Sequence, residues 1–226
     1  MILKCWSVPD LNPLYLKKKQ PPLKDLEKSL SEKILLVTGG NSQLGQAIVR
    51  KALAQEAQVF FTYFQHEEEA RPLLDLGAEG FRINLADMRE IDQLVKSLKE
   101  KISCLDILIH NAACVRDHSL QNISEEDWDQ VLTVNLKAPY YLTKKAMPLL
   151  FKSESAKIFM IISRLAVTGG FGVSNYAAAK GGLIGLTKSL AAELGKKKIA
   201  VNAINPGFMR SRMTEHLPEE VIRKNL

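Results

Sequence analysis

The sequence predicts an α/β fold: a Rossmann-like, doubly wound parallel sheet in three layers, α/β/α. Three observations lead to this prediction. From Lys33 onward, short apolar runs alternate with helical patterns, which is typical of successive β-α units. A glycine-rich stretch at 38–45 follows the first apolar run, where dinucleotide-binding sheets have their phosphate turn. Ser163 follows the fifth run, at the edge where open α/β sheets bind their ligands.

Each element is predicted from apolar periodicity and from the residues that begin or end it. The strands are predicted at 34–37, 59–62, 80–83, 105–109, 158–162 and 199–204, and the helices at 44–55, 66–76, 87–101, 124–150 and 174–194. Ser124 and Asp127 resemble a capping box at the start of the fourth helix, and Gly195 is expected to end the fifth. Right-handed crossovers then place the first and fourth strands side by side.

The chain divides into two zones. Residues 1–33 contain four prolines and seven lysines against four acids, so we predict an irregular basic N-terminal extension, with a short helix at 24–32. Residues 34–226 form the predicted nucleotide-binding domain. No aromatic-basic interleaving supports nucleic-acid binding, and a solvated basic arm explains the charge.

Composition narrows the class of protein. The three cysteines, Cys5, Cys104 and Cys114, lack the spacing of metal ligands and fit reduced thiols, so we expect a cytoplasmic protein without a metal site. No apolar run approaches the roughly 18 residues of a membrane span, and Lys4 and Asp10 interrupt the amino terminus, unlike a secretory signal.

Tyr176 and Lys180 stand four residues apart in a predicted helix, so their side chains share one face. Such a pair is usually an exposed helical contact, but here Ser163 lies thirteen residues upstream at the end of a strand. A neighbouring ammonium favours the phenolate and is expected to lower the pKa of Tyr176. A phenol of this kind can exchange a proton with an oxygen on a reacting carbon. The three residues predict a hydride-transfer site.

The turn after the first strand is Thr38-Gly39-Gly40-Asn41-Ser42-Gln43-Leu44-Gly45. Its backbone amides and the following helix can meet a pyrophosphate, although tight β-α turns also need glycine for structural reasons alone. Gln43 stands where glycine would allow the closest approach to phosphate. We predict dinucleotide binding here, with tighter packing and weaker binding as consequences of Gln43.

The end of the second strand bears on the choice of cofactor. An acid there would bind the ribose 2′-hydroxyl of NAD, but residues 62–66 contain none before Glu67. This favours NADP(H) over NAD(H). The preference is weak, because neither this stretch nor the glycine-rich turn contains an arginine that could bind the 2′-phosphate of NADP.

With these residues in place, the chain from about Lys33 to Met213 resembles the short-chain dehydrogenase/reductase family, and most of all its 3-oxoacyl-[acyl-carrier-protein] reductases. Residues 110–113, His-Asn-Ala-Ala, stand where the family has Asn-Asn-Ala-Gly. Asn135 matches the asparagine of the family's catalytic tetrad, and Asn205-Pro206-Gly207 matches its Pro-Gly turn beside the nicotinamide.

The resemblance implies a role for each matched residue. Tyr176 protonates the substrate oxygen as hydride arrives, Ser163 hydrogen-bonds that oxygen, and Lys180 lowers the phenol pKa and holds the nicotinamide ribose. Asn135 positions a water that connects Lys180 to solvent. The implied cofactor contacts are Thr38, Gly39, Gly40, Ser42, Gln43, Leu44, Gly45, Asn84, Leu85, Asn111, Ala112, Tyr176, Lys180, Pro206 and Gly207.

The chain departs from the family pattern at several further places. Gln43 and Ala113 replace glycines, and Asn84 stands where the family commonly has an adenine-binding aspartate. The chain ends at Leu226, after a helical stretch at 218–224, where the family continues with a helix and a seventh strand. We therefore expect six strands, with the usual seventh missing.

The resemblance implies an NAD(P)H-dependent reductase, with a 3-oxoacyl thioester on acyl carrier protein as the leading substrate in fatty acid synthesis. Lys197 stands at a basic position of the family, which could meet the acidic carrier protein. Glu154 stands where the family has a second basic residue, which counts against such docking. The lysines at 196–198 could equally be a solvated helix end. Apolar residues after Gly207 favour a hydrophobic substrate. Two alternatives stay open: a reductase or dehydrogenase of another small molecule (a pterin, sugar alcohol or ketone), and a non-catalytic dinucleotide-binding protein.

The family also implies an assembly. Its two helices corresponding to 124–150 and 174–194 pair with their counterparts in another subunit. Val131, Val134, Leu142 and Met147 give the first helix apolar faces that can serve this interface or the subunit's own core. We expect a homodimer, because the helices can supply the roughly 800 Å² per partner of a stable interface. A tetramer is doubtful without the seventh strand.

Overall fold

The computed structural model describes residues 29–209, 211–212, 214–215, 219–220 and 223. Within these residues lie six strands: β1 (Ile34–Val37), β2 (Gln58–Tyr63), β3 (Glu79–Arg82), β4 (Ile107–His110), β5 (Lys157–Ile161) and β6 (Ala200–Ile204). They form one sheet in the order β3-β2-β1-β4-β5-β6, and every neighbouring pair is parallel. The predicted doubly wound sheet is therefore confirmed, including the adjacency of the first and fourth strands.

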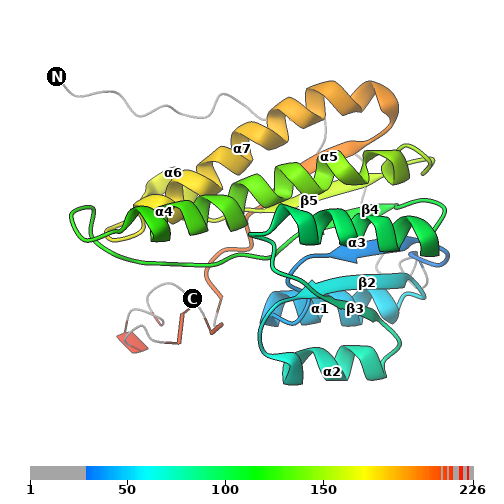
Figure 1. The fold of residues 1–226 in the computed structure, drawn as a ribbon, viewed down its shortest axis with the longest axis horizontal. Helices are drawn as coiled ribbons and strands as arrows, with labels where there is room; N and C mark the ends of the chain where they lie inside the picture. The colour runs from blue at the N-terminus through cyan, green and yellow to red at the C-terminus, as the bar shows by residue number, and fades with distance from the viewer. Residues whose placement is uncertain (1–28, 210, 213, 216–218, 221–222, 224–226) are drawn as a thin grey trace.

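Helices cover both faces of the sheet (Figure 1). One face carries α1 (Gln43–Leu53) and α2 (Glu67–Asp75). The other carries α3 (Met88–Lys101), α5 (Ala138–Leu150) and α7 (Ser174–Leu194). The short α6 (Leu165–Thr168) packs against α7, and a 3-10 turn, η4 (Gly195–Lys197), follows α7. The three predicted layers are present.

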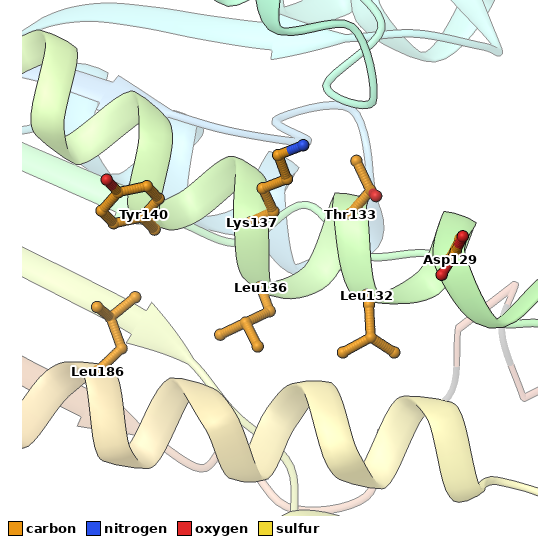
Figure 2. Close-up of a pocket in the computed structure, with 7 residues that line it drawn as sticks. All are labelled: Asp129, Leu132, Thr133, Leu136, Lys137, Tyr140 and Leu186. Carbon is orange, nitrogen blue, oxygen red and sulfur yellow. The ribbon is translucent and has the colours of Figure 1, made fainter.

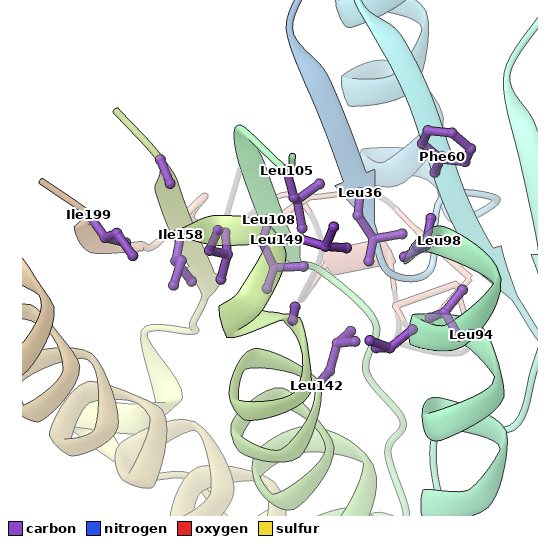
Figure 3. Close-up of a cluster of buried hydrophobic side chains, with 14 of the residues drawn as sticks. Leu36, Phe60, Leu94, Leu98, Leu105, Leu108, Leu142, Leu149, Ile158 and Ile199 are labelled. Atoms are coloured by element: carbon purple, nitrogen blue, oxygen red, sulfur yellow. The ribbon is translucent and has the colours of Figure 1, made fainter. Parts of the chain in front are cut away.

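Each face of the sheet has its own apolar core. Leu36, Leu108 and Ile158 of the central strands pack with Leu94 of α3 and Leu142 of α5 (Figure 3). The opposite core joins Val37 and Phe61 to Val49 of α1 and Leu73 of α2. Successive strand side chains alternate between the two cores, and a parallel sheet buried on both faces needs apolar residues at almost every strand position. The two cores fix the carboxyl ends of the strands, where the polar residues gather.

The helix predicted at 124–150 consists of three parts: α4 (Glu125–Leu132), a π-turn, η3 (Thr133–Lys137), and α5. Ser124 caps α4 as predicted, because its Oγ accepts a hydrogen bond from the backbone N–H of Asp127 at 3.0 Å. The π-turn is a difference from the prediction, since apolar periodicity does not distinguish one wider turn within a helix. Asn135 lies at its centre and is fully buried.

Three smaller differences concern the ends of elements. The sequence prediction lacks α6, which follows Ser163 almost directly. α7 ends at Leu194, before Gly195, as predicted, but Gly195 is not left-handed: its φ is −58°, and Lys198, at φ 60°, makes the left-handed turn after η4. β4 extends to His110 but begins only at Ile107, because the N–H of Leu105 donates to Leu149 rather than to a strand.

Parts of two predictions lie outside the described residues. Most of the predicted extension at 1–33 does so, and its described end, residues 29–32, is a turn rather than the end of a helix. Of the helical stretch predicted at 218–224, Glu219, Glu220 and Arg223 are described and helical. Across the described ranges, no helix is both long enough and apolar enough to span a membrane.

Candidate active site

Ser163, Tyr176 and Lys180 come together at the carboxyl edge of the sheet. Ser163 follows β5, and the other two lie on the first two turns of α7. The phenol of Tyr176 and the hydroxyl of Ser163 share a hydrogen bond. Lys180 Nζ lies 5.7 Å from the centroid of the Tyr176 ring. The structure thus joins the three residues for which the sequence predicts hydride-transfer chemistry.

The charges at this site differ from the expectation. Burial raises the pKa of Tyr176 and outweighs the opposing hydrogen bond with Ser163. Lys180 is 2% exposed, its Nζ donates to the carbonyl of Ile161 at 2.7 Å, and burial lowers its pKa to about 8. The expected net lowering of the Tyr176 pKa is therefore wrong for this structure, because burial outweighs the interactions that favour the phenolate. The phenol is protonated at neutral pH, as a proton donor must be.

Asn135 is anchored by both ends of its amide. Its Oδ1 accepts from the N–H of Cys114 at 2.9 Å, and its Nδ2 donates to the carbonyl of Cys114 at 2.8 Å. This pair of bonds ties the π-turn to the loop after β4. Because both polar atoms of the side chain are bonded to Cys114, the Asn135 side chain is not the group expected to bind the relay water. That water could instead be held by the main chain of the π-turn.

The glycine-rich turn is shaped by close packing. Gly39 has φ +63°, and a Cβ there would lie 2.8 Å from the Cα of Ala112. A Cβ on Gly40 would lie 2.6 Å from Phe61, and one on Gly45 would lie 2.2 Å from the carbonyl oxygen of Gly39. Packing within the protein is therefore enough to require all three glycines. Their presence alone does not show that the turn binds a cofactor.

Thr38 and Asn111 hold this turn in place. Thr38 Oγ1 accepts from the N–H groups of Asn111 and Ala112, both at 3.0 Å. The Asn111 amide donates to the carbonyls of Thr38 and Gly39, at 3.0 and 2.8 Å, and to Ser42 Oγ at 3.1 Å. The side chain of Asn111 therefore holds the glycine-rich turn in position. Asn111 could contact a cofactor only through its own backbone, or indirectly through the turn.

The amino end of α1 fits a dinucleotide phosphate. Ser42 is its N-cap, and Ser42 Oγ accepts from the N–H of Gly45 at 3.2 Å. Among the described residues, no protein acceptor takes the N–H groups of Gln43 and Leu44, which point out of the first helical turn. Such N–H groups and the helix dipole favour an anion. The Gln43 side chain is exposed, so its bulk does not disturb packing within the turn.

The remaining predicted cofactor residues lie along the same edge. Asn84 Oδ1 accepts from the N–H of Ala86 at 3.0 Å, and Leu85 packs against the apolar core below it. Pro206 and Gly207 follow β6, and Gly207 has φ +78°. The predicted set therefore follows the carboxyl ends of β1, β3, β4, β5 and β6, around the switch point of the sheet.

Two buried polar residues of this region receive no role in the sequence prediction. Asn175 accepts from the N–H of Tyr176 at 2.7 Å and donates to the carbonyl of Arg116 at 3.0 Å, which positions the start of α7. His110 Nε2 lies 2.8 Å from Thr143 Oγ1, and burial together with the charge of Lys180 lowers the pKa of His110 to about 3. The polar residue that ends the apolar run 107–109 was the available signal for His110, whereas Asn175, next to Ser174, offered no such signal.

Comparison with known proteins agrees with this geometry. The model of the family described as short chain dehydrogenase matches residues 33–221. The 3-oxoacyl-[acyl-carrier-protein] reductase of Synechocystis sp. is 36% identical over 200 residues, which cover 86% of this chain and 81% of the relative. The reductase of the same name from Thermotoga maritima is 36% identical over 198 residues, 84% of this chain and 80% of the relative.

Two solved structures share the fold. The Pseudomonas aeruginosa RhlG/NADP active-site complex has a TM-score of 0.79 and 30% identity, covering 85% of this chain and 78% of that one. A short chain dehydrogenase from Shigella flexneri has a TM-score of 0.77 and 26% identity, covering 83% of this chain and 76% of that one. The chain therefore belongs to the short chain dehydrogenase family, as an oxidoreductase that acts on CH–OH and C=O groups with a nicotinamide dinucleotide.

Proposed function

We propose that this protein is an NADPH-dependent reductase of 3-oxoacyl thioesters, with acyl carrier protein as the acyl carrier, in fatty acid synthesis. The joining of Ser163, Tyr176 and Lys180 beside the glycine-rich turn carries the proposal. The names of the Synechocystis and Thermotoga relatives support the substrate class. The similarity to the RhlG/NADP complex supports NADP as the cofactor.

In this proposal, the cofactor, when bound, would supply a hydride to the carbonyl carbon. Tyr176 gives its phenolic proton to the carbonyl oxygen, because its raised pKa keeps that proton in place at neutral pH. Ser163 donates a hydrogen bond to the same oxygen and stabilises the charge that develops there. The phenolate left on Tyr176 is stabilised by the Lys180 ammonium, whose pKa of about 8 keeps it charged at pH 7. Lys180 would also hold the ribose of a bound nicotinamide dinucleotide.

Asn135 has a positioning role. Its amide is bonded to the backbone of Cys114, so the water that reprotonates the site through Lys180 would be held by the main chain of the π-turn. Asn135→Ala removes both bonds to the loop after β4. We expect a lower kcat from slower reprotonation.

An apolar substrate arm fits the surface beside the site. Val167 and Phe171, on the segment that follows Ser163, are 70% and 94% exposed. A Cβ on Gly172 would lie 3.9 Å from the backbone of His118, so the loop that leads to Leu120, which is 78% exposed, passes close to this segment. Exposed apolar side chains gathered at a site favour a ligand with an apolar portion, and this favours the acyl thioester over a sugar alcohol.

The reaction is tested with Tyr176→Phe and a panel of substrates. With acetoacetyl thioester, we expect NADPH oxidation to fall roughly 10²- to 10⁴-fold, while NADPH binding weakens far less, because only one hydroxyl contact is lost. Faster turnover of dihydropterins than of acetoacetyl thioester by the unaltered protein would favour the pterin alternative. NADPH binding without oxidation by any ketone would favour the non-catalytic one.

Docking of the acidic carrier protein is a separate part of the proposal. Lys197 Nζ lies 5.1 Å from the ring centroid of the half-exposed Phe151, so a cation and an apolar group share this surface. Lys197→Glu should weaken turnover of the carrier-bound substrate and spare a simple thioester, and Lys188→Glu on α7 serves as the control. An equal loss on both substrates would contradict docking at Lys197.

We also propose a homodimer through α4, α5 and α7. Val131 and Leu142 are fully buried, so these residues serve the subunit's own core. Partly exposed residues at the edge of that core line a shallow hollow of about 360 Å³, among them Leu132, Leu136, Tyr140 and Leu186 (Figure 2). None of its lining residues belongs to the catalytic set. Sedimentation of the unaltered protein should show a dimer that Leu136→Glu converts to monomer, and an active monomer at micromolar concentration would contradict the interface.

A further inference from the structure

The end of β2 is where an enzyme of this fold distinguishes NADP from NAD. An acid there favours the 2′-hydroxyl of NAD, and a nearby arginine favours the 2′-phosphate of NADP. The stretch from Thr62 to His66 contains neither residue type. A cation for the phosphate must therefore come from elsewhere in the fold.

The neighbouring strand brings such a cation to this place. Arg82 is the last residue of β3 and pairs in register with Tyr63, the last residue of β2. Its side chain is exposed, and its Nε donates to the carbonyl oxygen of Phe64 at 3.4 Å. The guanidinium thus lies against the end of β2, although Arg82 is 18 residues further along the chain than Phe64.

The turn that receives Arg82 is itself held in place. Asn41, in the glycine-rich turn, donates from its Nδ2 to the carbonyls of Gln65 and His66, at 2.7 and 3.2 Å. These bonds join the end of β2 to the turn that meets the pyrophosphate. The place reached by Arg82 is therefore fixed relative to the dinucleotide turn.

Among the described residues, the guanidinium of Arg82 is not neutralised by a neighbouring carboxylate, although three glutamates begin α2 nearby. In the part of the chain that the structure describes, no carboxylate forms an ion pair with Arg82. Of the three glutamates at the start of α2, Glu68 lies 3.4 Å from His66, and Glu69 pairs with Arg212. Glu67 is exposed to solvent. Most of the Arg82 guanidinium fork stays available to a phosphate, which it can bind in a bidentate manner.

We propose that Arg82 binds the 2′-phosphate of NADP and sets the preference for NADP over NAD. This inference rests on the proposed function and names the group that would carry its cofactor choice. The arginine comes from β3 rather than from the glycine-rich turn or from the end of β2.

Calorimetry on the full chain tests the proposal with 2′,5′-ADP and 5′-AMP as probes, since they differ only in the 2′-phosphate. Arg82→Ala should bind 2′,5′-ADP roughly 10- to 100-fold more weakly, as expected for the loss of hydrogen bonds to a charged group. Its affinity for 5′-AMP should stay within about twofold. Arg82→Lys should be intermediate, because it keeps the charge but loses the fork. Arg50→Ala, an exposed arginine in the last turn of α1, is the matched control.

The outcomes separate this inference from the proposed function. If the unaltered protein prefers 2′,5′-ADP and Arg82→Ala keeps that preference, the role of Arg82 is refuted while NADPH-dependent reduction stands. If the unaltered protein binds both probes equally, the choice of NADP and the role of Arg82 fail together. A tenfold loss for 2′,5′-ADP alone, matched by a higher KM for NADPH and an unchanged KM for NADH, supports it.

Discussion

The two halves of the carboxyl edge of the sheet are built by different means. The nucleotide half, around β1, β2 and β3, is formed mainly by backbone: glycines with no room for a Cβ, and N–H groups at the start of α1. The catalytic half, around β4, β5 and α7, is formed by buried polar side chains. His110, Asn135, Asn175 and Lys180 are each at most 3% exposed.

This difference predicts which kind of change, steric or in pH, disturbs each half most. Backbone N–H groups do not titrate, so the nucleotide half keeps its anion site over a wide range of pH. Buried side chains lose their hydration, and the charged form of each is disfavoured. This is why the pKa of Lys180 falls to about 8 and that of His110 to about 3. Steric changes should therefore damage the first half most, and changes of pH the second.

The largest predicted effect concerns acid stability and His110. Its pKa is about 3 in the folded chain and about 6.5 when unfolded, so the unfolded state binds more protons between these values. Stability is therefore lost as pH falls from 6.5 toward 3, by about 3 kcal/mol at pH 4. His110→Asn, which restores the family residue, should remove this loss.

Urea unfolding from pH 7 to pH 4 measures the difference between the two proteins. Their stabilities at pH 7 serve as the reference, because the substitution also changes the contact with Thr143. Parallel pH profiles for the two proteins would show that burial of His110 does not control acid stability.

The next effect tests the packing of the nucleotide half. Gly45→Ala places a Cβ 2.2 Å from the carbonyl oxygen of Gly39, and the backbone must shift to accept it. We expect a loss of about 2–3 kcal/mol, as for an overpacked core, and weaker cofactor binding. Gly185→Ala in α7 is the control, because its Cβ meets nothing within 4 Å, and alanine is the better helix former. Equal unfolding midpoints for both variants would contradict this account of the turn.

The smallest effect compares two serine caps, one in each half. Ser42 Oγ accepts from Gly45 and Asn111 and donates to the carbonyl of Gly39 at 2.9 Å, whereas the Oγ of Ser124 caps only its own helix. Ser42→Ala should therefore cost roughly 2 kcal/mol and Ser124→Ala about 1 kcal/mol. Chemical denaturation of both variants measures the two losses. A larger loss for Ser124→Ala would show that the network around Ser42 adds nothing to its cap.

The sequence alone determined the fold class, the order of the units, the glycine-rich turn and the set Ser163, Tyr176 and Lys180. These features are local: strand and helix periods, glycine spacing, and the i,i+4 relation within α7 each depend on residues close together in the chain. The edge of the sheet at which they meet follows from the parallel β-α order.

Only the tertiary structure decided how these parts act on one another. The π-turn at Asn135, the anchoring of Asn135 to Cys114 and the placing of Arg82 against Phe64 are contacts between separate segments. The raised pKa of Tyr176 likewise depends on burial, which outweighs its hydrogen bond with Ser163. Burial and contact between distant segments arise only when all the layers have packed, so no local pattern in the chain contains them.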